Sequence, residues 1–291
     1  KDKVLLLVID NLRYDQWKVV EPLFTKFYNK TSEEYLYSIL PTATQYARNS
    51  FFAGLLPLEI EKRFPDKWFN DNEDGNKNEF EFDFLKDQMK RLGLQGKSSK
   101  YIKILNADFE RKILEDFNQH KNNDLLVIVY NFIDILSHAK TDNTIVDQLI
   151  RDDKTFRSLT YNWFENSSLI KIIKLAAENG FKLVITTDHG MIYVRKPSKV
   201  VGDRETSTNI RYKTGKSLTY EDKDVWAITN PEKLFLPKGN VSSKYIFAKN
   251  NLFFAYPKNY NHFVNYYKDT YQHGGISLEE IIIPFCVLEP K

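Results

Sequence analysis

Four stretches of the chain are largely apolar and are bounded by polar residues. Residues 4–9 (VLLLVI), 125–130 (LLVIVY) and 182–187 (KLVITT) lack the alternation of a half-exposed strand. Such short runs predict strands that are buried on both faces of a sheet. Residues 280–287 (EIIIPFCV) predict a fourth strand, in which Pro284 indicates an edge position or a bulge.

Helical periodicity occupies much of the chain between these runs. Apolar residues recur at helical spacing over 15–29, 84–92 and 109–117, and residues 142–178 predict two helices with a break near 166–168. A serine at this break can cap the second helix, and Gly180 indicates its end. Strands that alternate with helices predict an α/β fold, with a mostly parallel central sheet and helices on both faces.

Two polar segments interrupt this alternation. Residues 66–77 (DKWFNDNEDGNK) predict a surface loop. Residues 195–251 are rich in Lys, Ser and Thr, with short β-like runs at 225–228 and 245–248, and we expect an insertion that lies over the sheet edge. We therefore expect one α/β domain over 1–291 with this β-containing insertion. Because the chain begins without Met and enters a strand at once, we expect a fragment from which an N-terminal domain has been removed.

Composition narrows the possible functions. The 291 residues contain 42 Lys and Arg, 39 Asp and Glu, five His and one Cys. The net charge of +3 does not indicate a dedicated DNA-coating protein, and no apolar run approaches the roughly 18 residues of a membrane span. The single cysteine, Cys286, excludes an internal disulfide and a cysteine-rich zinc site. It is expected in the core of the last strand. Any metal must therefore be held by Asp, Glu and His.

Acidic residues and histidines follow the predicted strands. Asp10 follows the first, Asp134 and His138 the second, and Asp188-His189 the third. Because the carboxyl ends of parallel strands share one edge of a sheet, we expect these side chains to converge. Each has a simpler alternative. Asp10 can cap a helix or be a buried hydrogen-bonded group, and an i,i+4 pair such as Asp134/His138 is often a surface contact.

His273-Gly274-Gly275 precedes the last predicted strand. Two glycines after a histidine permit a tight turn around a ligand, although an ordinary glycine turn has the same sequence. Together with the strand-end residues, His273 completes a pool of oxygen and nitrogen ligands that suits two divalent cations roughly 3.5–4 Å apart, as in phosphoryl transfer. Carboxylates and imidazoles favour zinc or manganese over calcium.

A threonine is the candidate nucleophile. Thr42 and Thr44 precede a predicted helix that ends at Gly54. A hydroxyl at a helix N-terminus lies at the positive end of the helix dipole, and a metal can promote its deprotonation. The alternative is that one of the two threonines is only the N-cap.

The order of these motifs resembles the alkaline phosphatase superfamily. The motifs are the strand before Asp10, PTATQYARNS followed by GLLP, Asp134-xxx-His138, Asp188-His189-Gly190 and His273-Gly-Gly. VLLLVIDNLRYDQW and HGGISLEEIIIPF resemble a PglZ domain, most closely the C-terminal effector domain of PorX-type response regulators of type IX secretion. The resemblance covers residues 3 to about 289.

This resemblance implies a role for each motif residue. Thr44 is implied as the nucleophile because of its spacing to residues 54–57, with Thr42 left open. Asn49 or Arg48 is expected to contact the phosphate oxygens. The implied ligands are Asp10, Thr44, Asp188 and His189 for one metal, and Asp134, His138 and His273 for the other.

The resemblance also implies an activity and a setting. A threonine nucleophile resembles the phosphodiesterase branch, which implies a two-metal (Zn²⁺ or Mn²⁺) phosphodiesterase for nucleotides or oligonucleotides. The expected setting is a cytoplasmic response-regulator effector without a membrane segment, a homodimer in the full-length protein, with a protein partner in secretion control. The main alternative is a metal-containing regulatory and dimerisation module with little catalysis. A phosphomonoesterase or phosphomutase-like enzyme also stays open. A sulfatase is disfavoured because Cys286 lies in no Cys-x-Pro-x-Arg motif.

A basic segment within the predicted insertion offers a further hypothesis. Such a cluster could guide a nucleotide backbone, although Asp203 and Glu205 interrupt it and make a solvated loop an equal alternative. Its members are Arg195, Lys196, Lys199, Arg204, Arg211, Lys213 and Lys216.

Overall fold

The computed structural model describes residues 3–203, 206–239 and 242–291. Arg204 and Glu205 of the basic segment lie outside them. The chain divides into two compact units. Unit 1 comprises Lys1–Tyr37, Gly93–Gly190 and Ile282–Lys291, and unit 2 comprises Ser38–Leu92 and Met191–Ile281. The expectation of one domain with an insertion over the sheet edge stays a prediction.

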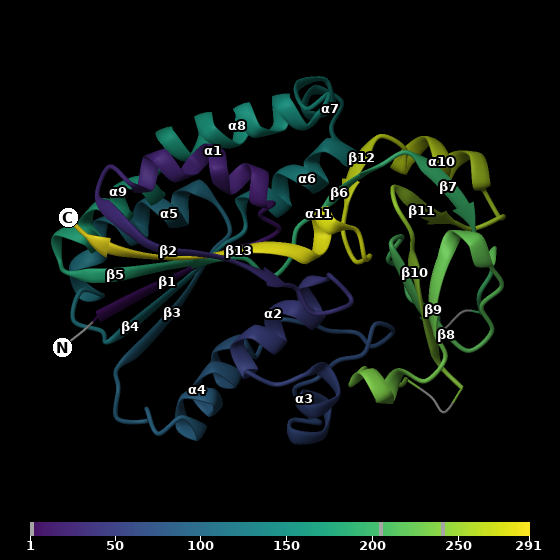
Figure 1. The fold of residues 1–291 in the computed structure, drawn as a ribbon, viewed down its shortest axis with the longest axis horizontal. Helices are drawn as coiled ribbons and strands as arrows, with labels where there is room; N and C mark the ends of the chain where they lie inside the picture. The colour runs from purple at the N-terminus through teal and green to yellow at the C-terminus, as the bar shows by residue number, and fades with distance from the viewer. Residues whose placement is uncertain (1–2, 204–205, 240–241) are drawn as a thin grey trace. The chain divides into compact units, whose positions relative to one another are not determined.

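Unit 1 is built on a six-stranded mixed sheet (Figure 1). Its parallel pairs are β1 with β4, β1 with β5, and β3 with β4, whereas β13 runs antiparallel to both of its neighbours. β13 is therefore the one strand of the six that runs against the others. The spatial order is β2 (Tyr28–Tyr37), β13 (Ile282–Pro290), β5 (Phe181–Thr186), β1 (Lys3–Ile9), β4 (Leu125–Tyr130) and β3 (Ser99–Ile104).

The buried strands confirm the prediction from apolar runs. In β1, Leu5, Leu7 and Val8 are fully buried, and Leu7 lies in register with Ile128 of β4 and Ile185 of β5. Leu7 and Val8 are consecutive and therefore lie on opposite faces, so this part of the strand has no exposed face for polar side chains. The α/β class and the positions of four predicted strands are thus confirmed.

The expectation of an edge position is wrong for the strand as a whole, although Pro284 itself pairs with β2 alone. β13 lies between β2 and β5 rather than at an edge, and its register shift falls between Val287 and Leu288. β13 pairs with β5 only from Phe285 onward, so Pro284 precedes the part of the strand that has neighbours on both sides. Cys286 is fully buried in this strand, as expected, and burial raises the pKa of its thiol to about 12.

Helices cover one face of the unit 1 sheet. Figure 1 shows α1, α5, α8 and α9 along the same side of the strands. The predicted break is confirmed at Ser167, but the Ser167 hydroxyl donates to the Phe164 carbonyl instead of capping α9. Helix α9 ends just before Gly180, which has φ +74°. The helices of unit 1 are α1 (Tyr14–Phe24), α5 (Ala107–Glu115), α6 (Phe132–Asp142), α7 (Thr144–Leu149), α8 (Asp153–Asn166) and α9 (Ser168–Glu178), with a 3-10 turn at Phe117–Gln119.

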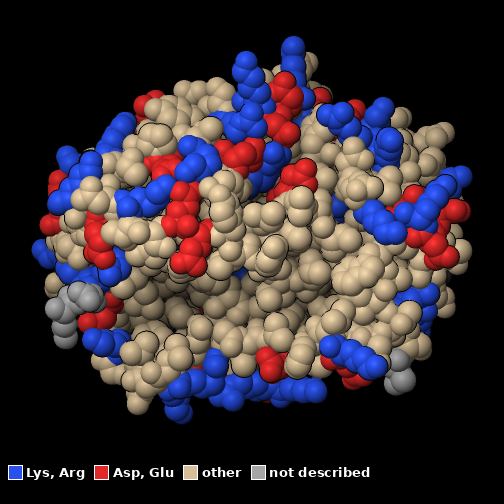
Figure 2. Space-filling view, viewed as in Figure 1, with Lys and Arg blue, Asp and Glu red and all other residues tan. Residues whose placement is uncertain are grey.

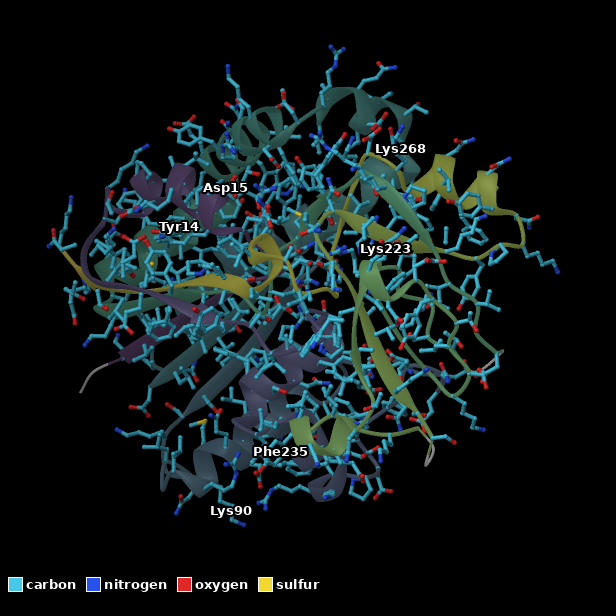
Figure 3. All side chains as sticks on the ribbon, turned by 45° about the vertical axis from the view of Figure 1, so that its right-hand side comes forward. Tyr14, Asp15, Lys90, Lys223, Phe235 and Lys268 are labelled. Atoms are coloured by element: carbon cyan, nitrogen blue, oxygen red, sulfur yellow. The ribbon has the colours of Figure 1, made fainter. Side chains whose placement is uncertain are left out.

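An ion-pair network fixes the start of α1 after β1. Arg13 contacts Asp15 at 2.9 Å and Asp153 at 2.5 Å, and Arg157 of α8 reaches Asp15 at 2.8 Å. Figure 3 shows Tyr14 and Asp15 together at this end of the helix. The connection that follows Asp10 is therefore tied to α8.

Unit 2 combines helices with small sheets. The predicted runs 225–228 and 245–248 are confirmed as β9 and β10 of a three-stranded sheet. The helices are α2 (Thr44–Ala53), α3 (Pro57–Arg63), α4 (Glu81–Arg91), α10 (Tyr260–Tyr267) and α11 (Leu278–Ile281), with 3-10 turns at Asp222–Asp224 and Pro231–Leu234. The sheets are β8 (Tyr212–Gly215), β10 (Lys244–Ala248) and β9 (Val225–Ile228); β11 (Leu252–Ala255) with β7 (Lys196–Lys199); and β12 (Thr270–Gln272) with β6 (Ile192–Val194).

Unit 2 has hydrophobic packing of its own. One cluster in this unit consists of Val200, Leu218, Val225, Ile246, Ala248 and Phe254, so the predicted insertion is more than a surface loop. Helix α2 ends at Gly54, which takes a left-handed conformation at φ +57°, and a Cβ there would meet the Gln88 side chain of α4. A buried ion pair, Arg48 Nε to Glu81 Oε1 at 2.5 Å, also joins α2 to α4.

The basic segment does not form the single surface cluster that its sequence permits. Arg211 and Lys213 are buried, whereas Arg195, Lys196 and Lys216 are exposed. Arg211 pairs with Glu280 in the interior, which removes its charge from any nucleic-acid surface. Figure 2 shows acidic and basic side chains interspersed on the visible face. Among the described residues, no helix is long and apolar enough to span a bilayer.

Candidate metal centre and nucleophile helix

The carboxyl ends of β1 and β5 bring three predicted ligands together in unit 1. Asp10 follows β1, and its N–H donates to the Tyr130 carbonyl at 2.9 Å, while Asp188 and His189 follow β5. All three side chains are buried, and one ligand atom from each lies within 4.8 Å of the others. The prediction that these residues converge at the sheet edge is confirmed for this group.

The spacing of the group suits a divalent cation. His189 Nε2 is 3.9 Å from Asp10 Oδ1 and 3.7 Å from Asp188 Oδ2. These separations are too long for direct hydrogen bonds, and they are close to the roughly 3.3 Å between ligands of a tetrahedral ion with bonds of about 2 Å. His189 Nδ1 lies 3.1 Å from the Gly190 carbonyl, which directs Nε2 toward the carboxylates. The donor set therefore fits a divalent metal ion.

Asp134 and His138 lie one turn apart on α6, as their spacing predicts for a helix. Their side chains are 3.5 Å apart, from His138 Nε2 to Asp134 Oδ1, and His138 is 57% exposed. The hydrogen bond to Asp134 is the largest influence on the His138 imidazole and raises its pKa, which the nearby Asp10 and Asp142 charges reinforce. That these two residues bind a second ion stays a prediction.

Two asparagines that sequence analysis did not single out hold these carboxylates. Asn131 Nδ2 donates to Asp10 Oδ2 at 3.0 Å. Asn11 takes φ +64°, its N–H donates to Asp188 Oδ1 at 3.3 Å, and its side-chain amide donates to Asp134 Oδ1 at 3.3 Å. Asn11 directly follows Asp10 after the first predicted strand, and Asn131 directly follows the last residue of the predicted strand 125–130. That position was the signal available in the sequence.

The two candidate nucleophiles in unit 2 have different surroundings. Thr44 is the first residue of α2 and is partly exposed, and Ala43 is the N-cap, so the alternative that a threonine caps this helix is wrong. Thr42 is fully buried, and its hydroxyl donates to the Gly275 carbonyl at 2.8 Å and accepts from the Gly274 N–H at 3.0 Å. The Thr42 hydroxyl is thus engaged with the turn that follows His273, and the role of Thr44 as nucleophile stays a prediction.

His273 belongs to unit 2, whereas Asp134 and His138 belong to unit 1. His273 Nδ1 lies 3.1 Å from the Thr42 carbonyl, and its own carbonyl accepts from Asn209 Nδ2 at 3.2 Å. The ring thus makes the same kind of contact as His189, from Nδ1 to a backbone carbonyl. Its place in a second metal site with Asp134 and His138 stays a prediction.

Arg48 and Asn49 are engaged within unit 2. Both are buried. Arg48 pairs with Glu81, and Asn49 Nδ2 donates to the Lys77 carbonyl at 2.9 Å. Asn78 Nδ2 donates to Asn49 Oδ1 at 3.2 Å and to the Thr44 carbonyl at 3.0 Å. These contacts bind the neighbouring loop to α2, and a phosphate-binding role for Arg48 or Asn49 stays a prediction.

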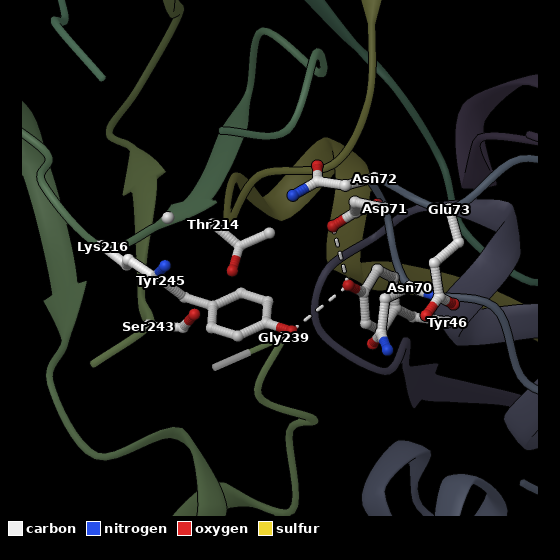
Figure 4. Close-up of a pocket in the computed structure, with 11 residues that line it drawn as sticks. Tyr46, Asn70, Asp71, Asn72, Glu73, Thr214, Lys216, Gly239, Ser243 and Tyr245 are labelled. Atoms are coloured by element: carbon white, nitrogen blue, oxygen red, sulfur yellow. Dashed lines mark hydrogen bonds between the residues drawn. The ribbon is translucent and has the colours of Figure 1, made fainter. Parts of the chain in front are cut away.

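A polar cavity of about 420 Å³ lies in unit 2 beside α2 (Figure 4). The loop predicted at 66–77 is polar and turn-rich, but Asp71 points inward and accepts from Tyr46 at 2.9 Å and Tyr212 at 2.7 Å. Burial raises the pKa of Asp71, and the tyrosine hydroxyls oppose this shift. The cavity is lined by Tyr46, Asn70, Asp71, Asn72, Glu73, Thr214, Gly215, Lys216, Gly239, Ser243 and Tyr245.

Comparisons with known proteins agree with this architecture. Murine ectonucleotide pyrophosphatase/phosphodiesterase 5 superposes with a TM-score of 0.60 at 13% identity, covering 99% of this chain and 88% of that chain. Phosphonoacetate hydrolase from Sinorhizobium meliloti 1021, in complex with phosphonoformate, superposes with a TM-score of 0.62 at 11% identity, covering 98% and 89%. No curated protein matches in sequence. The family model of the BREX system PglZ alkaline phosphatase-like domain matches residues 1–288. The chain therefore belongs to the PglZ family of alkaline phosphatase-like domains.

Proposed function

We propose that the domain is a two-metal phosphodiesterase for nucleotides or oligonucleotides, with Thr44 as nucleophile. The observation that carries this proposal is the buried group of Asp10, Asp188 and His189, whose spacing suits a divalent cation, in a chain of this family. Zn²⁺ is the proposed metal, with Mn²⁺ as the alternative. The proposed ligands are Asp10, Thr44, Asp188 and His189 for one ion, and Asp134, His138 and His273 for the other.

The position of Thr44 at the start of α2 supports its proposed role as nucleophile. It begins a ten-residue helix whose first turn carries no acidic side chain, so the partial positive charge of the helix N-terminus is not offset there. Bound cations would lower the pKa of the hydroxyl and neutralise the charge that develops on the phosphate. The Thr44 Oγ–P bond forms as the bond to the leaving oxygen breaks, and water then cleaves Oγ–P and restores the hydroxyl.

The cavity beside α2 supports a substrate with a polar organic group. Its volume of about 420 Å³ lies within the range of small-ligand pockets, and hydroxyls and amides from Thr214, Ser243 and Asn70 line it. Asp71 and Glu73 disfavour a second phosphate at that position because like charges repel. A nucleoside portion of a phosphodiester has the matching chemistry.

The proposed biological setting rests on the resemblance to PorX-type effector domains. It comprises a cytoplasmic response-regulator effector linked to type IX secretion, a homodimer in the full-length protein and a protein partner. In this setting, the natural role of the site is a catalytic output that an upstream domain controls.

The test combines metal analysis with turnover of bis(p-nitrophenyl) phosphate and p-nitrophenyl phosphate. We expect bound divalent metal, faster turnover of the diester, and a loss of at least about 1,000-fold in kcat for Thr44→Val. Thr25→Val, which removes a hydroxyl at the end of α1, is the matched control and should keep full activity.

Three results would count against parts of this proposal. A purified domain without divalent metal contradicts the two-metal function. Metal binding without turnover of either ester supports the alternative of a regulatory module. Undiminished turnover in Thr44→Val contradicts the nucleophile assignment and makes Thr42 the next residue to test.

A further inference from the structure

The turn that carries His273 is held from one side by Thr42. The Thr42 hydroxyl accepts from the Gly274 N–H at 3.0 Å and donates to the Gly275 carbonyl at 2.8 Å. The Thr42 carbonyl lies 3.1 Å from His273 Nδ1. One fully buried residue thus contacts the backbone on both sides of the Gly274–Gly275 peptide and also the histidine ring.

The same turn is held from the other side by Glu280. Its Oε1 accepts from the Gly275 N–H at 2.8 Å, and its Oε2 accepts from the Ser277 N–H at 3.0 Å. Arg211 contacts both oxygens, at 3.1 and 2.7 Å, and both side chains of this pair are fully buried. Burial acts to raise the pKa of Glu280, but Arg211 outweighs it and holds the pKa below its ordinary value. The carboxylate therefore stays charged and accepts these bonds.

The two glycines are explained by these contacts. A Cβ at Gly275 would lie 2.6 Å from Arg211 Nη2 and 2.8 Å from Glu280 Oε2. Gly274 has φ +117°, and a Cβ there would lie 2.7 Å from Asn209 Oδ1. The glycines of the His-Gly-Gly motif are needed because buried side chains pack directly against this backbone.

We infer that Thr42, Glu280 and Arg211 form a clamp that sets the orientation of His273 and couples it to Thr44, two residues after Thr42. Since His273 Nδ1 is committed to the Thr42 carbonyl, a metal has to take Nε2. Thr42 is thus a positioning residue. Through it, the orientation of the metal ligand His273 and the position of the nucleophile Thr44 depend on the same contacts. The metal-binding part of this inference rests on the proposed function.

The clamp is tested by the tautomer of His273 in metal-free protein, read from its ring ¹⁵N NMR signals. The His273→Gln spectrum assigns these signals. Wild type should show a proton on Nδ1 in slow exchange. Thr42→Val removes both hydroxyl bonds and should give mixed tautomers, whereas Thr42→Ser should retain the wild-type pattern. Thr42→Ala gives the same test if Val does not fold.

Zinc affinity, measured by competition with a chromophoric chelator, is the second readout. We expect one site to weaken by 10- to 100-fold in Thr42→Val and by less than about threefold in Thr42→Ser. The matched control is Thr160→Val in unit 1, because Thr160 is also fully buried and its hydroxyl also makes two hydrogen bonds. This variant should lose stability without a change in zinc affinity.

The two possible failures are distinguishable. A domain that binds no zinc contradicts the proposed function. In that case the His273 tautomer in Thr42→Val still shows whether the clamp sets the orientation of the ring. An unchanged His273 spectrum and unchanged zinc affinity in Thr42→Val overturn the clamp, even if turnover is lost. Loss of turnover alone would assign Thr42 to the nucleophile role.

Discussion

The two units hold their predicted ligands in different ways. In unit 1, Asp10, Asp188 and His189 follow adjacent parallel strands, and Asn11 and Asn131, which hold them, also lie at strand ends. In unit 2, His273 depends on Thr42, which is 231 positions away in the chain. Topology alone brings groups together at the edge of a parallel sheet. Where the backbone is irregular, a buried polar network has to fix the same geometry.

The buried carboxylates of the two units also differ in their partners. Two carboxylates in unit 1, Asp10 and Asp188, surround the imidazole of His189 at distances that suit an ion. The buried glutamates of unit 2 each contact an arginine, in Arg48–Glu81 and Arg211–Glu280. We therefore expect substitutions in the unit 1 group to change metal binding, and substitutions in the unit 2 pairs to change stability.

Asp188→Asn gives the largest expected effect. Removal of one ligand charge should eliminate stoichiometric metal at this site and lower diester turnover by about 1,000-fold, which corresponds to about 4 kcal/mol. The metal-free variant should unfold no more easily than metal-free wild type, because a buried charge has been removed. Metal analysis, kinetics and thermal unfolding measure the three quantities.

Asp87→Asn is the control for this prediction. Asp87 lies on α4 and pairs with Arg63 and Arg91 near the surface, so its loss should change stability by less than about 1 kcal/mol and leave metal binding intact. Full metal content in Asp188→Asn would contradict the distinction between a metal-ligand group in unit 1 and structural ion pairs in unit 2.

The sequence allows more of unit 1 than of unit 2 to be predicted. Buried strands have a strong signal, so β1, β4 and β5 and the residues after them can be located. The edge strand β2 (YNKTSEEYLY) is mostly polar and exposed and has no such signal. Asn11 could be found from its position and from the tolerance of asparagine for positive φ.

The clamp in unit 2 could not be predicted from its sequence. Glu280 begins a predicted strand and Thr42 precedes a predicted helix, but neither pattern relates the two residues to each other, and their partners lie far apart in the chain. Lys213 was assigned to a basic surface segment, but it is buried, because a charge pattern in a sequence carries no information on which side chains turn inward. Long-range polar contacts of this kind require the coordinates.

Glu280→Gln and Glu81→Gln form the second test. Each leaves a buried arginine without its carboxylate and should lower the free energy of unfolding by about 3–5 kcal/mol. Only Glu280→Gln should also change the His273 tautomer and zinc affinity, because Glu280 accepts hydrogen bonds from the Gly275 and Ser277 N–H groups of the turn, whereas Glu81 pairs with Arg48 between α2 and α4. Denaturant unfolding and His273 NMR provide the measurements.

An equal effect of both substitutions on His273 would show that general loosening of unit 2, and not the clamp, sets the ring. An effect of Glu81→Gln on turnover without a change at His273 would instead support the predicted phosphate-binding role of Arg48.

Asn11 offers a test of local positioning in unit 1. In Asn11→Gly the backbone can still adopt φ +64°, but the side-chain amide that donates to Asp134 is lost. Metal affinity should therefore fall by about 10- to 100-fold. Asn11→Ala should bind metal equally weakly and be less stable than Asn11→Gly by about 1–2 kcal/mol, because a left-handed alanine is strained. Unchanged affinity in both variants would show that the backbone N–H to Asp188 suffices to hold the site.

The pH dependence of unit 2 gives the smallest expected effect. Burial lowers the pKa of Lys213 to about 7, which the nearby Asp71 charge only partly opposes. Between pH 7 and about 10 the unfolded lysine is protonated and the folded one is neutral, so this residue makes stability increase with pH by up to about 1.4 kcal/mol per unit. Below pH 7 both states are protonated and the penalty stays constant. Lys213→Met should abolish this part of the slope.

Lys223→Met is the matched control, because Lys223 lies exposed on a 3-10 turn of the same unit (Figure 3). Its loss changes the net charge by the same amount, so its stability should follow the wild-type slope between pH 7.5 and 9.5. If Lys213→Met and Lys223→Met had equal slopes, Lys213 would have to be solvated in the folded protein. In that case the surface reading of the basic segment would apply to Lys213, and unit 2 would bury its charges only where an arginine and a glutamate meet.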